Sequence, residues 1–172
     1  TADEEQMVLG APLTEPAAET ALRRKEEELN RLFNRLRLLD SHTAFYLLRH
    51  CLWVPRLQYL LRASPVYLQS EPLNQLDTDL KTALRDLSNV YFDVTSWQQA
   101  VLPTGQGGLG LRRLEDVALP SFLASLHRCQ QLLSAILPAP FADTTSLERE
   151  QSTAAWLARA EGKPVADPDF CF

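Results

Sequence analysis

Apolar residues at helical spacing are the feature that most constrains the fold of this chain. Between about Ala18 and Leu39 they recur three, four or seven positions apart, at Leu22, Leu29, Leu32, Phe33, Leu36 and Leu39. Side chains with this spacing share one face of an α-helix. The stretch therefore predicts an amphipathic helix, and Thr14 followed by Pro16 is typical of the cap and first turn at its start.

The same period continues along most of the sequence. It predicts helices at about 42–53, 56–62, 72–90, 114–137 and 144–160, with a short helical segment around Trp97. A short apolar run at 4–13, closed by Gly10 and Pro12, indicates the end of a strand or hairpin. Strands and helices alternate nowhere. The predicted fold is all-α, an irregular array of five to seven helices with a short strand-like N-terminal remnant.

Cysteine and histidine spacing gives no indication of a metal site. The candidates are Cys51, Cys129, Cys171, His42, His50 and His127, and none forms a zinc-ligand pattern. We expect buried, reduced thiols, an intracellular location in cytoplasm or nucleus, and no metal or other cofactor. No apolar run approaches the roughly 18 residues of a membrane span. The chain starts with TADEEQ, without an initiator Met or a signal peptide, and we expect it to be a piece of something longer.

Charge is unevenly distributed along a chain whose net charge is −5. Residues 22–62 hold nine basic residues against four acidic ones, and most of the bases are arginines, which suit bidentate phosphate contacts. A basic stretch in an acidic protein indicates a possible anion-facing surface. The alternative is pairing along one helix, between Arg31 or Arg35 and the acids Glu27 and Glu28.

The segment 105–110, GQGGLG, has the formal spacing G-x-G-x-x-G of a dinucleotide-binding loop. That loop requires a strand directly before its first glycine, and here Pro103 interrupts any strand. We interpret Gly105, Gly107, Gly108 and Gly110 as a structural turn that needs positive φ angles and close chain approach. Leu109 and Leu111 should then point inward, and Arg112 and Arg113 outward.

Four segments together resemble a known family. They are MVLGAPL at 7–13, LLRHCLWVPRLQYLLRASP at 47–65, the pattern W-x-x-A-x-L-P-x-x-x-G-G-L-G-L-R-R from Trp97 to Arg113, and ALPSFLAS at 118–125. In this order they are similar to the region that follows the polymerase domain in non-LTR retrotransposon (LINE-like) reverse transcriptases. The resemblance covers about residues 7 to 137.

The resemblance implies a division of the chain. Residues 1–13 would be the end of a palm and its primer-grip-like hairpin, 14–137 a helical thumb-like and post-polymerase domain, and 138–172 a linker, a C-terminal helix and a coil tail. The Tyr-x-Asp-Asp carboxylates of the palm do not occur, and we interpret Asp77-Thr78-Asp79 as a solvated helix face. This chain alone is therefore expected to have no catalytic residues, while its parent would be an RNA-directed DNA polymerase.

A thumb packs against the template–primer duplex and keeps it in register. The expected partners are an RNA–DNA or RNA duplex and the missing palm, with no membrane and no small-molecule cofactor. We expect nucleic-acid contacts from Arg49, Arg56, Arg62, Arg112 and Arg113. Leu9 and Gly10 are primer-grip-like residues by resemblance only.

Two alternatives remain open: a helical protein–protein interaction module, and a nonfunctional retroelement remnant. An exposed face shared by the arginines of 22–62 and by Arg112 and Arg113 would favour nucleic acid. Pairing of these arginines with Glu26–Glu28 and Asp40 would favour the interaction module or the remnant.

Overall fold

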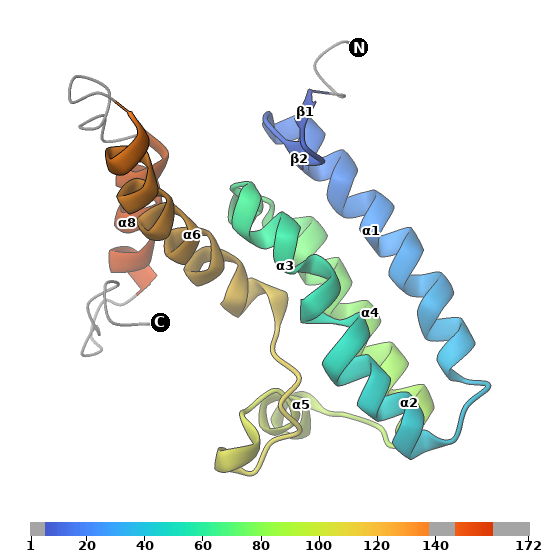
Figure 1. Ribbon diagram of the computed structural model, residues 1–172. Helices are drawn as coiled ribbons and strands as arrows, with labels where there is room; N and C mark the ends of the chain where they lie inside the picture. Colours follow the sequence, from blue (N-terminus) through green and yellow to red (C-terminus); the bar gives the residue numbers. More distant parts are fainter. Residues whose placement is uncertain (1–5, 138–146, 160–172) are drawn as a thin grey trace.

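The computed structural model describes residues 6–137 and 147–159, and it confirms the all-α fold class with a small strand remnant (Figure 1). Its elements are β1 (Met7–Val8), β2 (Ala11–Pro12), α1 (Glu15–Leu36), α2 (Ser41–Leu47), the π-helical turn η2 (Leu48–Leu52), α3 (Val54–Ala63), the 3-10 turn η3 (Val66–Leu68), α4 (Ser70–Ser88), α5 (Val94–Ala100), the 3-10 turn η4 (Thr104–Gln106), α6 (Leu114–Ile136) and α8 (Leu147–Arg159). Of the predicted C-terminal region 138–172, the structure describes α8, while the predicted linker and coil tail lie outside the described residues.

Side-chain caps and prolines set where the helices begin. Thr14 accepts a hydrogen bond from the Ala17 backbone N–H at the start of α1, and Asp40 accepts one from Thr43 at the start of α2. Pro55 lies in the first turn of α3, where its missing N–H costs nothing.

The core is formed mainly by α1, α3 and α4, and Trp53, from the bend between η2 and α3, is buried in it beside Phe33. These elements bury leucines and aromatic rings completely or nearly so: Leu22, Leu29, Phe33, Trp53, Leu57, Leu61, Leu76 and Leu80. Burial of this apolar surface is the main favourable term that holds the helices together. Helix α4 packs along α1, and α3 packs against the start of the bundle's other long helix, α6. Figure 1 shows α1 and α4 running beside each other.

Helix α6 joins this core through its first half only. Leu114, Val117 and Ala118 belong to the same buried cluster, whereas Leu132 and Ile136 near its end are largely exposed. Helix α8 packs along α6, away from the α1 side of the molecule (Figure 1). Among the described residues, no helix has the length and apolar character needed to cross a membrane.

Candidate nucleic-acid interface

The N-terminal strands form a hairpin whose tip is Leu9-Gly10. Met7 pairs with Pro12 and Val8 with Ala11, and both tip residues have positive φ, +51° and +82°. Two positive φ angles in succession are typical of a tight hairpin turn, although a leucine rarely adopts one. Leu9 is 93% exposed, and the Tyr59 hydroxyl of α3 donates to its carbonyl oxygen over 2.7 Å. Leu9 and Gly10, which the resemblance predicts to be primer-grip-like, therefore form an exposed tip that is hydrogen-bonded to α3.

A hollow of about 500 Å³ lies between this hairpin, α1 and α3. We call it the hairpin groove, and its lining residues are Met7, Gly10, Ala17, Thr20, Ala21, Arg24, Lys25, Glu28, Arg56, Tyr59 and Leu60. The α1 side carries three small residues in its first two turns, which leaves room between the helices. The α3 side contributes the aromatic ring of Tyr59.

Three cationic side chains line the hairpin groove, and Glu28 is the one carboxylate among its lining residues. Glu28 accepts a hydrogen bond from Lys25 Nζ over 2.8 Å and forms an ion pair with Arg56 of α3. The bond from Lys25 lowers the pKa of the Glu28 carboxyl. Arg24 is exposed and makes no ion pair with any described residue. The groove therefore has a net positive charge in an otherwise acidic chain.

The structure divides the five predicted arginines among three places. Arg56 lines the groove, and the partly buried Arg62 lies in the last turn of the same helix. Arg49 of η2 lies over Gly110, where a Cβ would come within 2.9 Å of its guanidinium carbon. Arg112 and Arg113 directly precede α6.

The sequence analysis asked whether these arginines pair with acidic residues, and the structure shows that some do and some do not. Arg56 pairs with Glu28, and Arg113 pairs with Asp116 over 2.8 Å. Within the described part of the chain, Arg49, Arg62 and Arg112 form no ion pair. Asp40 is not an arginine partner, because its carboxylate caps α2.

The glycine segment folds back on the end of α5. Gly107 and Gly110 have positive φ angles of +79° and +72°, and a Cβ on Gly108 would lie 2.1 Å from the Leu102 carbonyl oxygen. Gly105 does not have a positive φ, and a Cβ added there would meet no other atom within 4 Å. Three of the four glycines thus meet a steric requirement of the turn.

Backbone N–H groups at positions 106–110 of this segment are used within the chain. The N–H groups of residues 107–110 donate, in order, to the carbonyl oxygens of Thr104, Pro103, Ala100 and Leu102. A phosphate-binding loop needs such groups free to face its ligand. Leu111 is buried as expected, but Leu109 is 37% exposed, so its predicted inward position is wrong.

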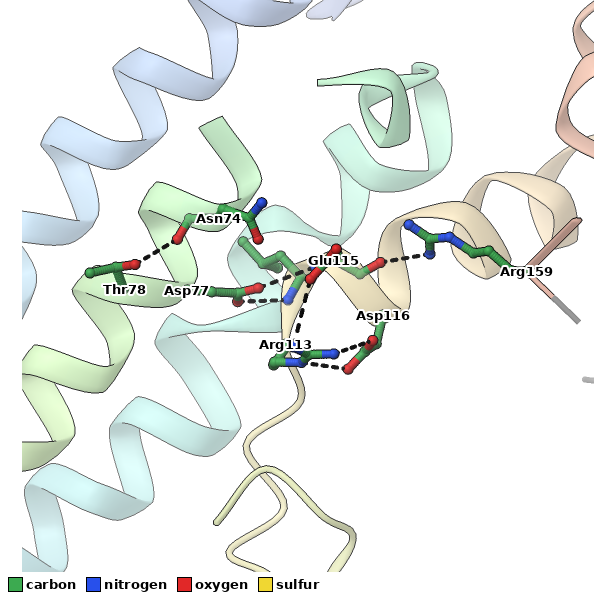
Figure 2. A network of polar contacts seen from close by, with 8 residues as sticks. Asn74, Asp77, Thr78, Arg113, Glu115, Asp116 and Arg159 are labelled. Atoms are coloured by element: carbon green, nitrogen blue, oxygen red, sulfur yellow. Dashed lines mark hydrogen bonds and ion pairs between the residues drawn. The ribbon is translucent and has the colours of Figure 1, made fainter. Parts of the chain in front are cut away.

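Asp77 of α4 lies at the centre of a polar network around the start of α6 (Figure 2). Its two carboxylate oxygens accept from the backbone N–H groups of Leu114, over 2.7 Å, and of Glu115, over 3.3 Å. The side chain thereby caps a helix that begins 37 residues later in the sequence. The interpretation of Asp77 as part of a solvated face is wrong, since the residue is only 7% exposed.

Burial raises the pKa of the Asp77 carboxyl to about 6, against the opposing effect of the two backbone hydrogen bonds. A raised carboxyl pKa is common at catalytic sites, but both oxygens here already hold backbone donors. Next to it, Arg113 pairs with Asp116, and Arg159 of α8 donates to the Glu115 carbonyl oxygen over 2.9 Å (Figure 2). We conclude that this network is structural.

In addition to the Asp77 cap, a hydrogen bond from Trp53 connects the helical core to the segment before α6. Its indole Nε1 donates to the Arg112 carbonyl oxygen over 2.7 Å, and the ring itself is 1% exposed. We call Trp53, Asp77 and residues 107–116 together the α6 junction. It holds the glycine segment and the first turn of α6 against the core.

The part of the chain that the structure describes contains no cluster of side chains suited to metal binding. No group of three or more histidine, cysteine, aspartate or glutamate residues there could hold a metal ion. Cys51 and Cys129 are free thiols, but both are exposed, so their predicted burial is wrong.

Sequence reasoning missed Arg24, Lys25 and Tyr59, which line the hairpin groove. Arg24 lies four positions after Thr20 and four before Glu28, so these residues share one face of α1. That spacing could have grouped them. The contribution of Tyr59 depends on how α3 docks, which local spacing does not show.

Comparison with known proteins adds no assignment. No family model matches the chain, and neither the curated proteins nor the solved structures gave a match.

Proposed function

We propose that this chain is the non-catalytic thumb and post-polymerase portion of a retrotransposon-type RNA-directed DNA polymerase. In this proposal the hairpin groove holds an RNA–DNA or RNA duplex by its phosphate backbone. The observation that carries the proposal is the cationic groove beside an exposed hairpin tip. Arg24, Lys25 and Arg56 supply the charge, and Leu9 and Gly10 form the tip.

Phosphate contacts are the appropriate chemistry for a part that positions a duplex without reading its sequence. Arginine and lysine fix the register of a nucleic acid through its phosphates and are indifferent to the bases. Because the duplex must advance during synthesis, indifference to sequence is a requirement for a polymerase thumb.

Tyr59 supplies a polar group that suits RNA. Its hydroxyl hydrogen is directed to the Leu9 carbonyl oxygen, so the lone pairs of the hydroxyl oxygen are left to accept a hydrogen bond. A ribose 2′-hydroxyl is such a donor, and contacts of this kind distinguish RNA from DNA.

The experiment is a binding titration of the chain with a short labelled RNA–DNA hybrid at low salt. The groove triple variant Arg24→Gln, Lys25→Gln, Arg56→Gln removes three groove cations. The control triple variant Arg23→Gln, Arg31→Gln, Arg35→Gln removes the same charge from exposed positions of α1 outside the groove.

We expect the groove triple variant to lose roughly 30-fold or more in affinity and the control triple variant only a few-fold. Equal losses would mean that overall charge, and not the groove, attracts the hybrid. Lack of binding by the unmodified chain would favour the helical interaction module or the remnant.

A further inference from the structure

Glu28 holds a position in the hairpin groove that no other carboxylate of the lining shares. It lies on α1 three residues after Lys25, and it also reaches Arg56 on α3. One carboxylate thereby forms ion pairs with two of the three groove cations. Its side chain remains 30% exposed and so has open solvent on one side.

A carboxylate and a phosphate compete for the same donors. Both present oxygens that accept the paired N–H groups of a guanidinium or the N–H groups of an ammonium. Glu28 accepts an N–H hydrogen bond from both Lys25 and Arg56, so a phosphate that enters the groove competes with Glu28 for these two cations. Because the Glu28 side chain is partly exposed, it can turn away into water when it is replaced.

We propose that Glu28 is a built-in counter-ion of the hairpin groove, which neutralises Lys25 and Arg56 in the free protein and is displaced by a phosphate of the bound nucleic acid. The inference rests on the proposed function. Glu28 then lowers the affinity of the groove for any polyanion, and Arg24, which has no such partner among the described residues, makes the first contact.

Weak binding is consistent with the task proposed for the groove. A duplex that must move step by step is better held by contacts that exchange than by contacts that persist. An internal carboxylate that competes at each step provides such exchange without any change in the fold.

The test compares Glu28→Gln with the matched control Glu27→Gln in the hybrid titration, over a series of salt concentrations. Both substitutions remove one negative charge from neighbouring positions of α1, but Glu27 is exposed and lies outside the groove lining. We expect Glu28→Gln to raise the affinity roughly 3- to 10-fold near 0.1 M salt and to steepen the log–log salt dependence by about one to two. Glu27→Gln should change the affinity less than about twofold.

The possible outcomes separate this inference from the proposed function. If the unmodified chain binds and Glu28→Gln binds no tighter than Glu27→Gln, the counter-ion role is excluded while the duplex-binding function stands. If neither the unmodified chain nor Glu28→Gln binds, although circular dichroism shows both folded, the duplex-binding function fails first and the inference with it. Adding Arg56→Gln to Glu28→Gln should cancel the gain, and a gain that persists would contradict the pairing with Arg56.

Discussion

In the hairpin groove, the carboxylate of Glu28 makes two close contacts, and in the α6 junction the carboxylate of Asp77 also makes two, but the contacts differ in kind. Glu28 in the groove is partly exposed and is held by two flexible cationic side chains. Asp77 in the junction is enclosed and is held by two backbone N–H groups. Mobile side-chain partners can be exchanged for a ligand, whereas backbone partners fix one segment of chain against another.

The two carboxyls also differ in the direction of their pKa. The hydrogen bond from Lys25 lowers the pKa of Glu28, while burial raises that of Asp77 to about 6. Ionised Glu28 therefore stabilises the fold above its ordinary pKa, and ionisation of Asp77 has the opposite effect. From this contrast we expect junction substitutions to change stability and groove substitutions to change binding.

Gly108→Ala should have the largest effect on stability. Its Cβ would overlap backbone atoms of Leu102 and Gln99, which no side-chain rotation can relieve, so we expect a loss of about 3 kcal/mol. Gly105→Ala is the matched control from the same turn, with an expected change within about 0.5 kcal/mol. The free energy of unfolding from chemical denaturation measures both. Similar values for the two variants would show that the junction is not sterically tight.

Asp77→Asn should remove a pH dependence. The folded pKa, about 6, exceeds the ordinary value of 3.8, so the folded protein binds the proton more tightly than the unfolded chain. The stability that this proton contributes is complete below pH 3.8 and is lost as the pH rises through 6. The measurement is the unfolding free energy of the unmodified chain and of Asp77→Asn at each pH. We expect the unmodified chain to lose about 2–3 kcal/mol relative to Asp77→Asn between pH 4 and pH 7.5. A constant difference would contradict the burial of Asp77.

Trp53→Phe should cost about 1–2 kcal/mol, because the Arg112 carbonyl oxygen loses the indole donor and the smaller ring leaves space. Trp156→Phe provides the comparison, since its Nε1 is buried and has no hydrogen-bond partner in the described part of the chain. Thermal denaturation of both variants measures the difference. If Trp156→Phe is the more costly, the tie between Trp53 and Arg112 contributes little.

The groove triple variant should have the smallest effect on stability, within about 1 kcal/mol, because partly exposed ion pairs contribute little to folding. Chemical denaturation of the groove triple variant and the control triple variant measures this. A loss of several kcal/mol would remove the contrast between the two regions, since the groove would then be part of what holds the fold together.

Much of the fold could be predicted from sequence because it depends on local rules. Helical spacing of leucines and the Thr14 cap specify α1 within the helix itself. The burial of Asp77 could also have been predicted, since it follows Leu73 by four positions and precedes Leu80 by three, on the apolar face of α4. The charge of Asp77 favours exposure and its position on the apolar face favours burial. The side chain is buried, so the position had the larger effect.

The groove could not be predicted in the same way. Arg24 and Lys25 become neighbours of Tyr59 only when α3 docks beside the hairpin, which is a contact between distant parts of the chain. The backbone donors of the glycine segment likewise have partners that only the folded turn provides. Local spacing carries no information on either arrangement.

The most direct test of the account is the salt dependence of hybrid binding by the unmodified chain and by the groove triple variant. If three groove cations contact phosphates, the log–log slope of affinity against salt should be steeper for the unmodified chain by about 2–3. Equal slopes would mean that these side chains contact no phosphates and would contradict the assignment of the hairpin groove as a nucleic-acid interface.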